Sequence, residues 1–450
     1  MKNILVTILF NLFHIALFSQ PLMTDEAVTE TIHRMGNLLE KNFVFPEKAT
    51  AMKIMLQENL AKGSYFKLTL EEFATVVYKD LQGISPDKHM RVDVFPERPL
   101  ANNGSPQSQN SKNSQKINPF KKIEFLPGNI AWVVLDNFPN PAICDDYVIS
   151  TMNSISSAKA VIFDLRNNGG GSPLLVQLML SYLLEPKTHY NSVFNRIKNT
   201  ISEYRTYQIN TGFESEGGIG SDNKEGKLNG KINSSGLIKA PVYVLTAKRT
   251  FSAAEEFAYN IQSIKRGKIV GNSTGGGAHQ MNGFGVHGRI GMLIPYTRPI
   301  NPFTGTDWEG TGVKPDIEVN ANDALKTAHA DALKTLQQME TTPEGKKDYD
   351  WTLKLSEYYY KSPAPLTDVE MKNISGNYGK DVRIFIDGGD LVAEVDLGGK
   401  RRFKLQQLDD LIFKVDSDII VVFSKEASGK IISAEAVYKN GQSELRQKVQ

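Results

Sequence analysis

Two short apolar segments, residues 160–165 and 240–246, are each followed at once by a polar turn and then by a helical pattern. Their length and their β-branched residues are typical of strands that are buried on both faces of a sheet. A third short strand is expected at residues 268–271, after the second helix. Strands that alternate with helices in this way predict an α/β core with a mostly parallel sheet.

Different patterns flank this core. Residues 24–81 carry apolar side chains at helical spacing, whereas the last part of the chain alternates apolar and polar residues between glycine turns. The expected division is a signal peptide (1–20), a helical N-terminal domain (22–98), a flexible linker (99–118), a core domain (119–320), a helical connector (321–362) and an accessory antiparallel β domain (366–450).

The first twenty residues have the pattern of a cleaved signal peptide. Lys2 is followed by an apolar run at 4–18 and then by Ser19-Gln20-Pro21. The run is too short for a spanning helix, so no stable membrane span is expected. No cysteine follows the run, which argues against a bacterial lipid anchor. We therefore expect an exported protein, either periplasmic or extracellular.

Composition excludes several classes of protein. Cys144 is the only cysteine, so neither an intramolecular disulfide nor a zinc–thiolate cluster is possible. The chain has 52 basic and 50 acidic residues, a formal net charge of +2. This balance indicates neither a nucleic-acid partner nor an anionic membrane surface.

Ser252 lies where the strand at 240–246 gives way to a helix. At a helix N-terminus, the partial positive charge and the free N–H groups favour an oxyanion that develops nearby, so the position suits a nucleophile. The spacing from Ser252 to Glu255 is also that of a capping box, so the serine fits a purely structural helix cap as well.

A glycine loop, Gly169 to Gly171, follows the strand at 160–165 and opens the next helix. Such a loop leaves backbone N–H groups unobstructed at a helix N-terminus. It lacks the lysine of a nucleotide P-loop and the Gly-x-Gly-x-x-Gly dinucleotide pattern. The loop therefore favours an oxyanion hole, although a tight turn would also explain one or two of the glycines. No cofactor and no metal are expected.

Taken together, these features resemble the C-terminal-processing (tail-specific) protease family of serine peptidases, in the branch shared with tricorn protease and the interphotoreceptor retinoid-binding protein. The resemblance covers roughly residues 25–320, in the order of the family. It rests on five blocks: Asp87-Lys-His-Met-Arg-Val92, Asp164-Leu-Arg-Asn-Asn-Gly-Gly-Gly171, Thr250-Phe-Ser-Ala-Ala-Glu255, Gly271-Asn-Ser-Thr-Gly-Gly-Gly-Ala-His279 and Asn301-Pro-Phe-Thr-Gly-Thr-Asp-Trp-Glu-Gly-Thr-Gly-Val313.

The resemblance implies a core built of crotonase-like ββα units and assigns roles to individual residues. Ser252 becomes the nucleophile, with His89 as its base and Glu309 as the supporting carboxylate. The oxyanion donors become the amides of Ala253 and of the glycine loop, at Gly170. His279 remains an alternative base, because it lies nearer to the nucleophile in the sequence.

Two departures from the family pattern concern mechanism and substrate. Gly277 occupies the place of the lysine base of the processing proteases, which argues against a serine–lysine dyad. The region between residues 92 and 130 has no room for a peptide-gripping PDZ domain.

The leading hypothesis is an exported serine peptidase that cleaves peptides or unfolded proteins through an acyl-enzyme. The alternatives are a non-catalytic ligand- or peptide-binding protein on the same fold and an esterase with the same site.

Overall fold

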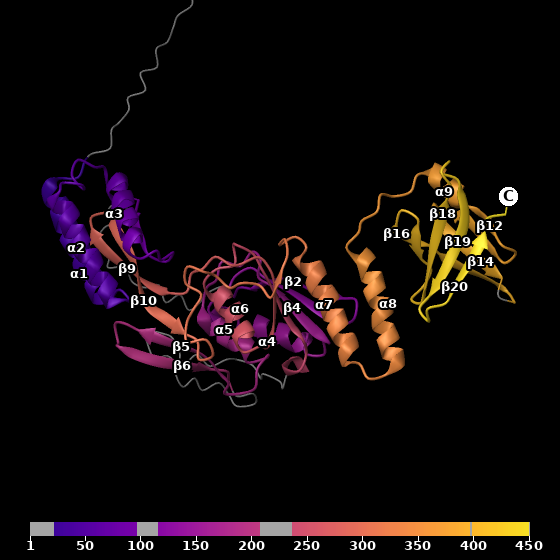
Figure 1. Ribbon diagram of the computed structural model, residues 1–450, viewed down its shortest axis with the longest axis horizontal. Helices are drawn as coiled ribbons and strands as arrows, with labels where there is room; N and C mark the ends of the chain where they lie inside the picture. Colours follow the sequence, from indigo (N-terminus) through magenta and orange to yellow (C-terminus); the bar gives the residue numbers. More distant parts are fainter. Residues whose placement is uncertain (1–21, 97–115, 208–235, 397, 450) are drawn as a thin grey trace, which may run out of the picture. The chain divides into compact units, whose positions relative to one another are not determined.

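The computed structural model describes residues 22–96, 116–207, 236–396 and 398–449 (Figure 1). The expected signal peptide and residues 99–115 of the expected linker lie outside these ranges. The chain forms two units, each described here by itself. The first unit joins the N-terminal segment to Asn191–Glu203 and Gly276–Gly310, and the second comprises Asn113–Tyr190, Tyr204–Gly275 and Thr311–Gln450.

Three helices and a sheet build the first unit. The side chains of Thr24 and Thr69 cap two of the helices, and Pro46 starts the third. The sheet has the order β1-β10-β5-β6, with β9 paired to β10. The elements are α1 (Asp25–Asn42), α2 (Pro46–Ala61), α3 (Leu70–Ile84), β1 (Arg91–Val94), β5 (His189–Asn195), β6 (Thr200–Arg205), β9 (Gln280–His287) and β10 (Ile290–Ile300).

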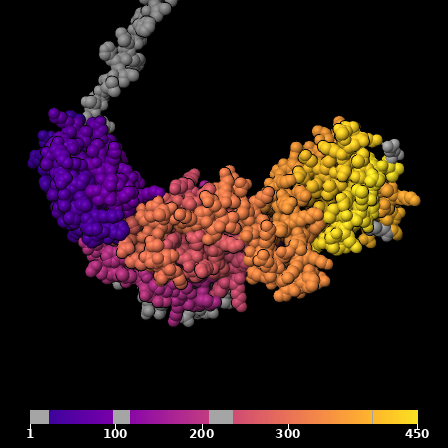
Figure 2. Space-filling view, viewed as in Figure 1, coloured from indigo at the N-terminus to yellow at the C-terminus, as the bar shows by residue number. Residues whose placement is uncertain are grey.

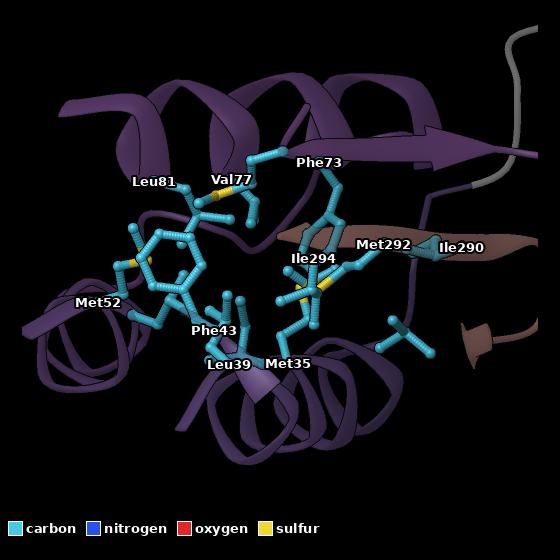
Figure 3. Close-up of a cluster of buried hydrophobic side chains, with 14 of the residues drawn as sticks. Met35, Leu39, Phe43, Met52, Phe73, Val77, Leu81, Ile290, Met292 and Ile294 are labelled. Carbon is cyan, nitrogen blue, oxygen red and sulfur yellow. The ribbon is translucent and has the colours of Figure 1, made fainter. Parts of the chain in front are cut away.

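The apolar stripes of these helices meet the sheet in a common core. Figure 3 shows Phe73 of α3 beside Met292 and Ile294 of β10, with Leu39 of α1 and Phe43, which follows that helix, in the same cluster. All five side chains are buried. The core therefore joins helices near the start of the chain to β10, which lies more than 200 positions later (Ile84 to Ile290).

The second unit contains the predicted parallel sheet, with the strand order β11-β8-β7-β4-β3-β2. All neighbouring pairs are parallel except β2 with β3. The strands are β2 (Phe120–Leu126), β3 (Ile130–Leu135), β4 (Ala160–Asp164), β7 (Val242–Thr246), β8 (Gly267–Gly271) and β11 (Ile317–Glu318). The helices of this region are α4 (Asp145–Ser154), α5 (Pro173–Leu180), α6 (Ala253–Ser263) and α7 (Ala324–Met339), with short 3-10 turns at Pro141–Ile143 and Gly236–Ile238.

Both faces of this sheet are covered by helices (Figure 1). Ile162 of β4 packs in one cluster with Leu333 of α7. The next residue, Phe163, points to the opposite face, where its ring lies 5.3 Å from that of Phe257 in α6. Because successive side chains of a strand alternate between faces, double coverage makes β4 apolar from Ala160 to Phe163, as the sequence pattern indicated.

The C-terminal part of the second unit consists of two antiparallel sheets, β12-β13-β14-β15 and β16-β17-β18-β19-β20. Their residues form one continuous mass, coloured yellow in Figure 2. The remaining elements are α8 (Pro343–Tyr359), α9 (Asp368–Ile374), β12 (Gly376–Tyr378), β13 (Val382–Asp387), β14 (Asp390–Asp396), β15 (Lys400–Lys404), β16 (Gln406–Asp409), β17 (Ile412–Lys414), β18 (Ile419–Lys425), β19 (Ile431–Tyr438) and β20 (Ser443–Gln447).

The predicted fold class is confirmed: helices at the N-terminus, a mostly parallel central sheet and antiparallel sheets at the C-terminus. One expected helical stretch, from residue 321 to about 360, is two helices. The chain turns after α7, and Thr342 caps α8 with Pro343 in its first turn. Among the described helices, none combines the length and the apolar character that a bilayer crossing requires.

The aromatic contacts beneath α6 predict the effect of a core truncation. Phe257 is fully buried between Phe138 and Phe163. Phe257→Ala should lower the free energy of unfolding of the second unit by about 3–5 kcal/mol, because it removes the ring and leaves a cavity. Urea titration followed by circular dichroism measures the change. Phe125→Ala, at a position that is 48% exposed in the same unit, is the control and should cost far less. Equal costs would contradict the packing described here.

Candidate active site

Ser252 has a backbone conformation that side-chain-bearing residues rarely adopt. Its φ is +54° and its ψ is −122°, at the step between β7 and the first residue of α6. A residue other than glycine in such a region stores of the order of 1–3 kcal/mol of strain, and this strain persists only where the surroundings enforce it. A serine on a strained strand-to-helix turn is typical of the nucleophile of serine hydrolases.

Hydrogen bonds from neighbouring loops hold this turn in place. The buried Thr250 hydroxyl donates to the carbonyl of Leu165 over 2.7 Å and accepts the N–H of Ala247. The Phe251 N–H donates to the carbonyl of Asn168, and the Gly275 N–H donates to that of Thr250. The turn is therefore tied to the end of β4 on one side and to the loop after β8 on the other.

The glycine loop packs directly against Ser252. Gly170 has a φ of +99°, and a Cβ added to it would lie 2.7 Å from the Ser252 Cβ and 2.9 Å from the Ala253 nitrogen. Only glycine fits this approach. The Gly170 N–H donates to the Asn168 side-chain oxygen over 2.8 Å. Ala253 is the first residue of α6, and the N–H groups of a first turn have no acceptor within their own helix.

Glu255 is the acidic residue of the capping box that begins at Ser252. Its fully buried carboxylate accepts the Ser252 N–H over 2.9 Å and a hydrogen bond from the Thr274 hydroxyl. That hydroxyl in turn accepts the N–H of Val313. The sequence therefore correctly paired Ser252 with Glu255, and the carboxylate also ties the turn to two later loops.

Asp164 and Arg166 form an anchor whose role the sequence analysis missed, although both belong to a quoted block. The Arg166 guanidinium makes two hydrogen bonds to the Asp164 carboxylate, of 2.8 and 2.6 Å. The indole of Trp132 donates to the same carboxylate, and Arg166 also donates to the carbonyl of Ala321. This pairing at the end of β4 orients the chain that enters the glycine loop.

The first unit brings together a second set of predicted residues. His279 Nδ1 lies 2.6 Å from Asp87 Oδ2, and Asp87 Oδ1 accepts the backbone N–H of His89 over 2.9 Å. Glu309 accepts the N–H of Ala278, and its carboxylate lies 3.7 Å from His279 Nδ1. Asp87, His89 and His279 are all buried.

The carboxylates of this cluster set the protonation of His279. Burial by itself would lower the pKa of the imidazole, but the hydrogen bond to Asp87 and the nearby carboxylates of Asp307, 3.7 Å from Nε2, and of Glu309 raise that pKa from 6.5 to about 9. The ring also packs edge-on against Phe45, with centroids 5.6 Å apart. At neutral pH His279 is therefore an imidazolium whose Nδ1–H is held by Asp87.

The pKa values of His89 and Glu309 both shift in the direction that favours the neutral form of the side chain. Burial lowers the pKa of His89 below 6.5, with the charge of His279 acting in the same direction and that of Asp87 against it. Burial and the charge of Asp87 raise the pKa of Glu309 from its usual range, although His279 and two backbone amides oppose that rise. The Trp308 indole, bonded to the carbonyl of Gly277, fixes the segment that carries Glu309.

Asp87, His89 and Glu309 also have the composition of a cation site. Each offers one ligand atom, and these atoms lie within 4.8 Å of one another. Two carboxylates and an imidazole suit a divalent cation such as zinc. The same carboxylates already accept hydrogen bonds from His279 and from the Ala278 amide, so they are also satisfied as an imidazole-orienting set.

The predicted site residues thus fall into two groups. Ser252, Gly170 and Ala253 lie together in the second unit, and His89, His279 and Glu309 lie together in the first. Asp87 was quoted only as the first residue of a sequence block, yet it contacts both histidines. The signal available in the sequence was its position two residues before His89 in a shared block.

Comparisons with known proteins identify the family of the chain. Peptidase family S41 matches residues 129–319, and the N-terminal domain of peptidase S41 in eukaryotic IRBP matches residues 22–124. Together the two matches span more than half of the chain. The chain therefore belongs to peptidase family S41. It is a serine-type peptidase, a hydrolase whose substrates are peptides or proteins, and the resemblance noted in the sequence is confirmed.

Solved structures with related folds were also found. A putative peptidase from Parabacteroides merdae is 16% identical, with a TM-score of 0.47, over 69% of this chain and 97% of that chain. The photosystem II D1 C-terminal processing protease is 15% identical, with a TM-score of 0.42, over 66% and 94%. Tricorn protease is 13% identical, with a TM-score of 0.41, over 74% and 37%.

The pKa of His279 predicts how stability depends on pH. Because the folded protein raises this pKa from 6.5 to about 9, the contribution of the imidazolium is fully present below pH 6.5 and is lost as the pH rises through 9. The Tm of the first unit should fall between pH 7 and pH 9, as measured by calorimetry. His279→Gln should flatten this dependence of Tm on pH. His287→Gln is the control and should leave it unchanged, because His287 lies in β9 of the same unit and its side chain is more exposed than that of His279. An unchanged slope in His279→Gln would refute the charged pair.

Proposed function

We propose that the protein is an exported serine peptidase that cleaves peptide bonds through an acyl-enzyme formed on Ser252. The observation that carries the proposal is the strained turn at the start of α6, where Ser252 has a φ of +54° and the glycine loop packs against it. Several buried hydrogen bonds maintain this conformation, whereas an ordinary helix cap needs no strain.

In the proposed reaction the Ser252 hydroxyl oxygen attacks the carbonyl carbon of the scissile peptide bond and loses its proton to a histidine. The negative charge that develops on the carbonyl oxygen is stabilised by the Ala253 amide and by an amide of the glycine loop. Collapse breaks the C–N bond, and the amine leaves with the proton from the imidazolium. Water then hydrolyses the ester by the same steps and restores Ser252.

We propose His89 as the base rather than His279. A base must be neutral to accept a proton, and the pKa of His89 is lowered by burial, whereas that of His279 is raised to about 9. His279 also has its Nδ1 engaged by Asp87 at 2.6 Å. It therefore fits a fixed positive charge within the cluster better than a proton acceptor.

Glu309 is proposed as the carboxylate that supports His89. The two side chains have ligand atoms within 4.8 Å of each other, and Glu309 is held by the Ala278 amide. Its raised pKa would fall once His89 became charged, because an imidazolium favours a neighbouring carboxylate in its ionised form. Asp87, which accepts the backbone N–H of His89, is proposed to position that residue.

Covalent labelling of the purified protein with a fluorophosphonate tests the nucleophile. The wild type should gain one adduct by intact mass, Ser252→Ala should gain none, and His89→Ala should react at least about a hundredfold more slowly, the usual contribution of a general base. Ser263→Ala, at the other end of α6, is the matched control and should label normally.

The same mass spectrum reports whether the proposed signal peptide, residues 1–20, has been removed from protein recovered after export. An adduct that persists in Ser252→Ala would exclude Ser252 as the nucleophile. A folded wild type without any adduct would favour a binding protein on the same fold. An intact N-terminus would contradict export through a cleaved signal.

The pH dependence of kcat/KM distinguishes the two histidines. If His89 is the base, activity should already be maximal at pH 7, with the midpoint of the acid limb below pH 6.5, because the neutral form persists down to the lowered pKa. If His279 were the base, the limb would have its midpoint near pH 9. A peptide substrate assayed from pH 5 to pH 10 separates these outcomes. His279→Gln should keep an acid limb, moved to higher pH, because the charge of His279 helps to lower the pKa of His89.

A further inference from the structure

An apolar cavity lies in the C-terminal β region, among residues that the peptidase chemistry does not use. Its volume is about 300 Å³, and its lining comes from both antiparallel sheets. The lining is almost entirely aliphatic and aromatic. An apolar cavity of about 150 Å³ holds benzene, and ligand pockets in proteins begin near 300 Å³. This cavity therefore has the size and the character of a small-molecule site.

Small side chains on the inner faces of the sheets create the space. Ala434 and Ala436 of β19 and Ala393 of β14 all line the cavity. In the strand registers, Ala434 pairs with Phe423 and Ala393 pairs with Ile384. Leucine or valine at these alanines would occupy much of the volume, so the cavity follows from residue size rather than from a break in the sheets.

The wall of the cavity is buried in part and partly exposed elsewhere. Tyr378 belongs to the lining, and its ring lies 5.7 Å from that of Phe423, which lies 5.5 Å from that of Phe413. Val382 and Ile419 also line the cavity while remaining partly exposed. A bound apolar molecule would remove this surface from water, which is favourable in proportion to the area covered.

The charged residues at the cavity limit the charge that the polar end of a ligand can carry. Arg446 and Glu444 are the charged residues in its lining. The Arg446 guanidinium contacts the Asp381 carboxylate at 2.8 Å and the Glu444 carboxylate at 2.7 Å, so two acids neutralise one cation. The Tyr438 hydroxyl also donates to Glu444. Around Glu444, therefore, an anionic head group would meet an excess of negative charge, whereas an uncharged or cationic one would not.

We propose that this cavity is a binding site for one small amphiphile, with an apolar body of about the size of a medium alkyl chain and an uncharged or cationic head. The site is separate from the peptidase chemistry and does not depend on Ser252. Binding would cover the partly exposed Val382 and Ile419 and place the head beside Glu444.

Fluorescence titration of the full protein with N-phenyl-1-naphthylamine, an uncharged probe that brightens in apolar surroundings, tests the site. We expect saturable binding of one probe, displaced by decyltrimethylammonium at about tenfold lower concentration than by decanoate. Ala436→Leu and Ala393→Leu should each weaken probe binding by about tenfold or more while keeping or raising the Tm, since each fills a cavity. Val437→Leu, on the same strand but outside the lining, is the matched control and should bind normally.

Fluorophosphonate labelling of the same variants separates this proposal from the peptidase proposal, because Ala436→Leu should still label at Ser252. Several results would overturn the site: no saturable binding to the wild type, unchanged binding in both filled variants, or stronger displacement by decanoate. Displacement by a short apolar peptide but not by decyltrimethylammonium would assign the cavity to peptide side chains instead. Using two variants on different strands keeps the test valid if one of them fails to fold.

Discussion

The positive φ of Ser252 is the constraint on which the second unit is organised. A strained residue needs support from several directions. Here the loop after β4 supplies the Leu165 and Asn168 carbonyls, the Thr250 hydroxyl bridges two loops, and Glu255 accepts the serine N–H. The glycine loop follows from the same requirement, because Gly170 approaches Ser252 more closely than any side chain would allow. Strand order places these contributors side by side: β4 and β7 are parallel neighbours, so their ends meet at one edge.

The first unit uses buried charge in a comparable way. The Asp87 carboxylate contacts the ring of His279 and accepts the backbone N–H of His89. The pKa values of the two histidines nevertheless shift in opposite directions. The difference arises because His279 contacts carboxylates through its ring, whereas burial dominates for His89. Asp87 therefore contacts two histidines whose pKa values favour different forms, the imidazolium for His279 and the neutral imidazole for His89. Two side chains of one type thus acquire different chemistry.

Much of the fold was predictable because its signals are local. Apolar strands such as 160–165 and 240–246, the caps of the helices and the glycine turns each depend on a few adjacent residues. The break between α7 and α8 was missed, although Thr342-Pro343 is a local signal for the start of a new helix. The pairing of Asp87 with His279 spans 192 positions, and no local pattern encodes a contact of that range. The same holds for the cavity, which depends on which alanines of two separate sheets face each other.

The sequence by itself determined the architecture and the family, since period, turn chemistry and five ordered blocks suffice for both. It also identified Ser252 and its partner Glu255, because their spacing on a helix start is a local property. Only the tertiary structure decided the strain at Ser252, the different protonation of the two histidines and the space between the C-terminal sheets. Backbone strain, desolvation and cavity volume each result from packing residues that are distant in the chain, so they exist only in the folded protein.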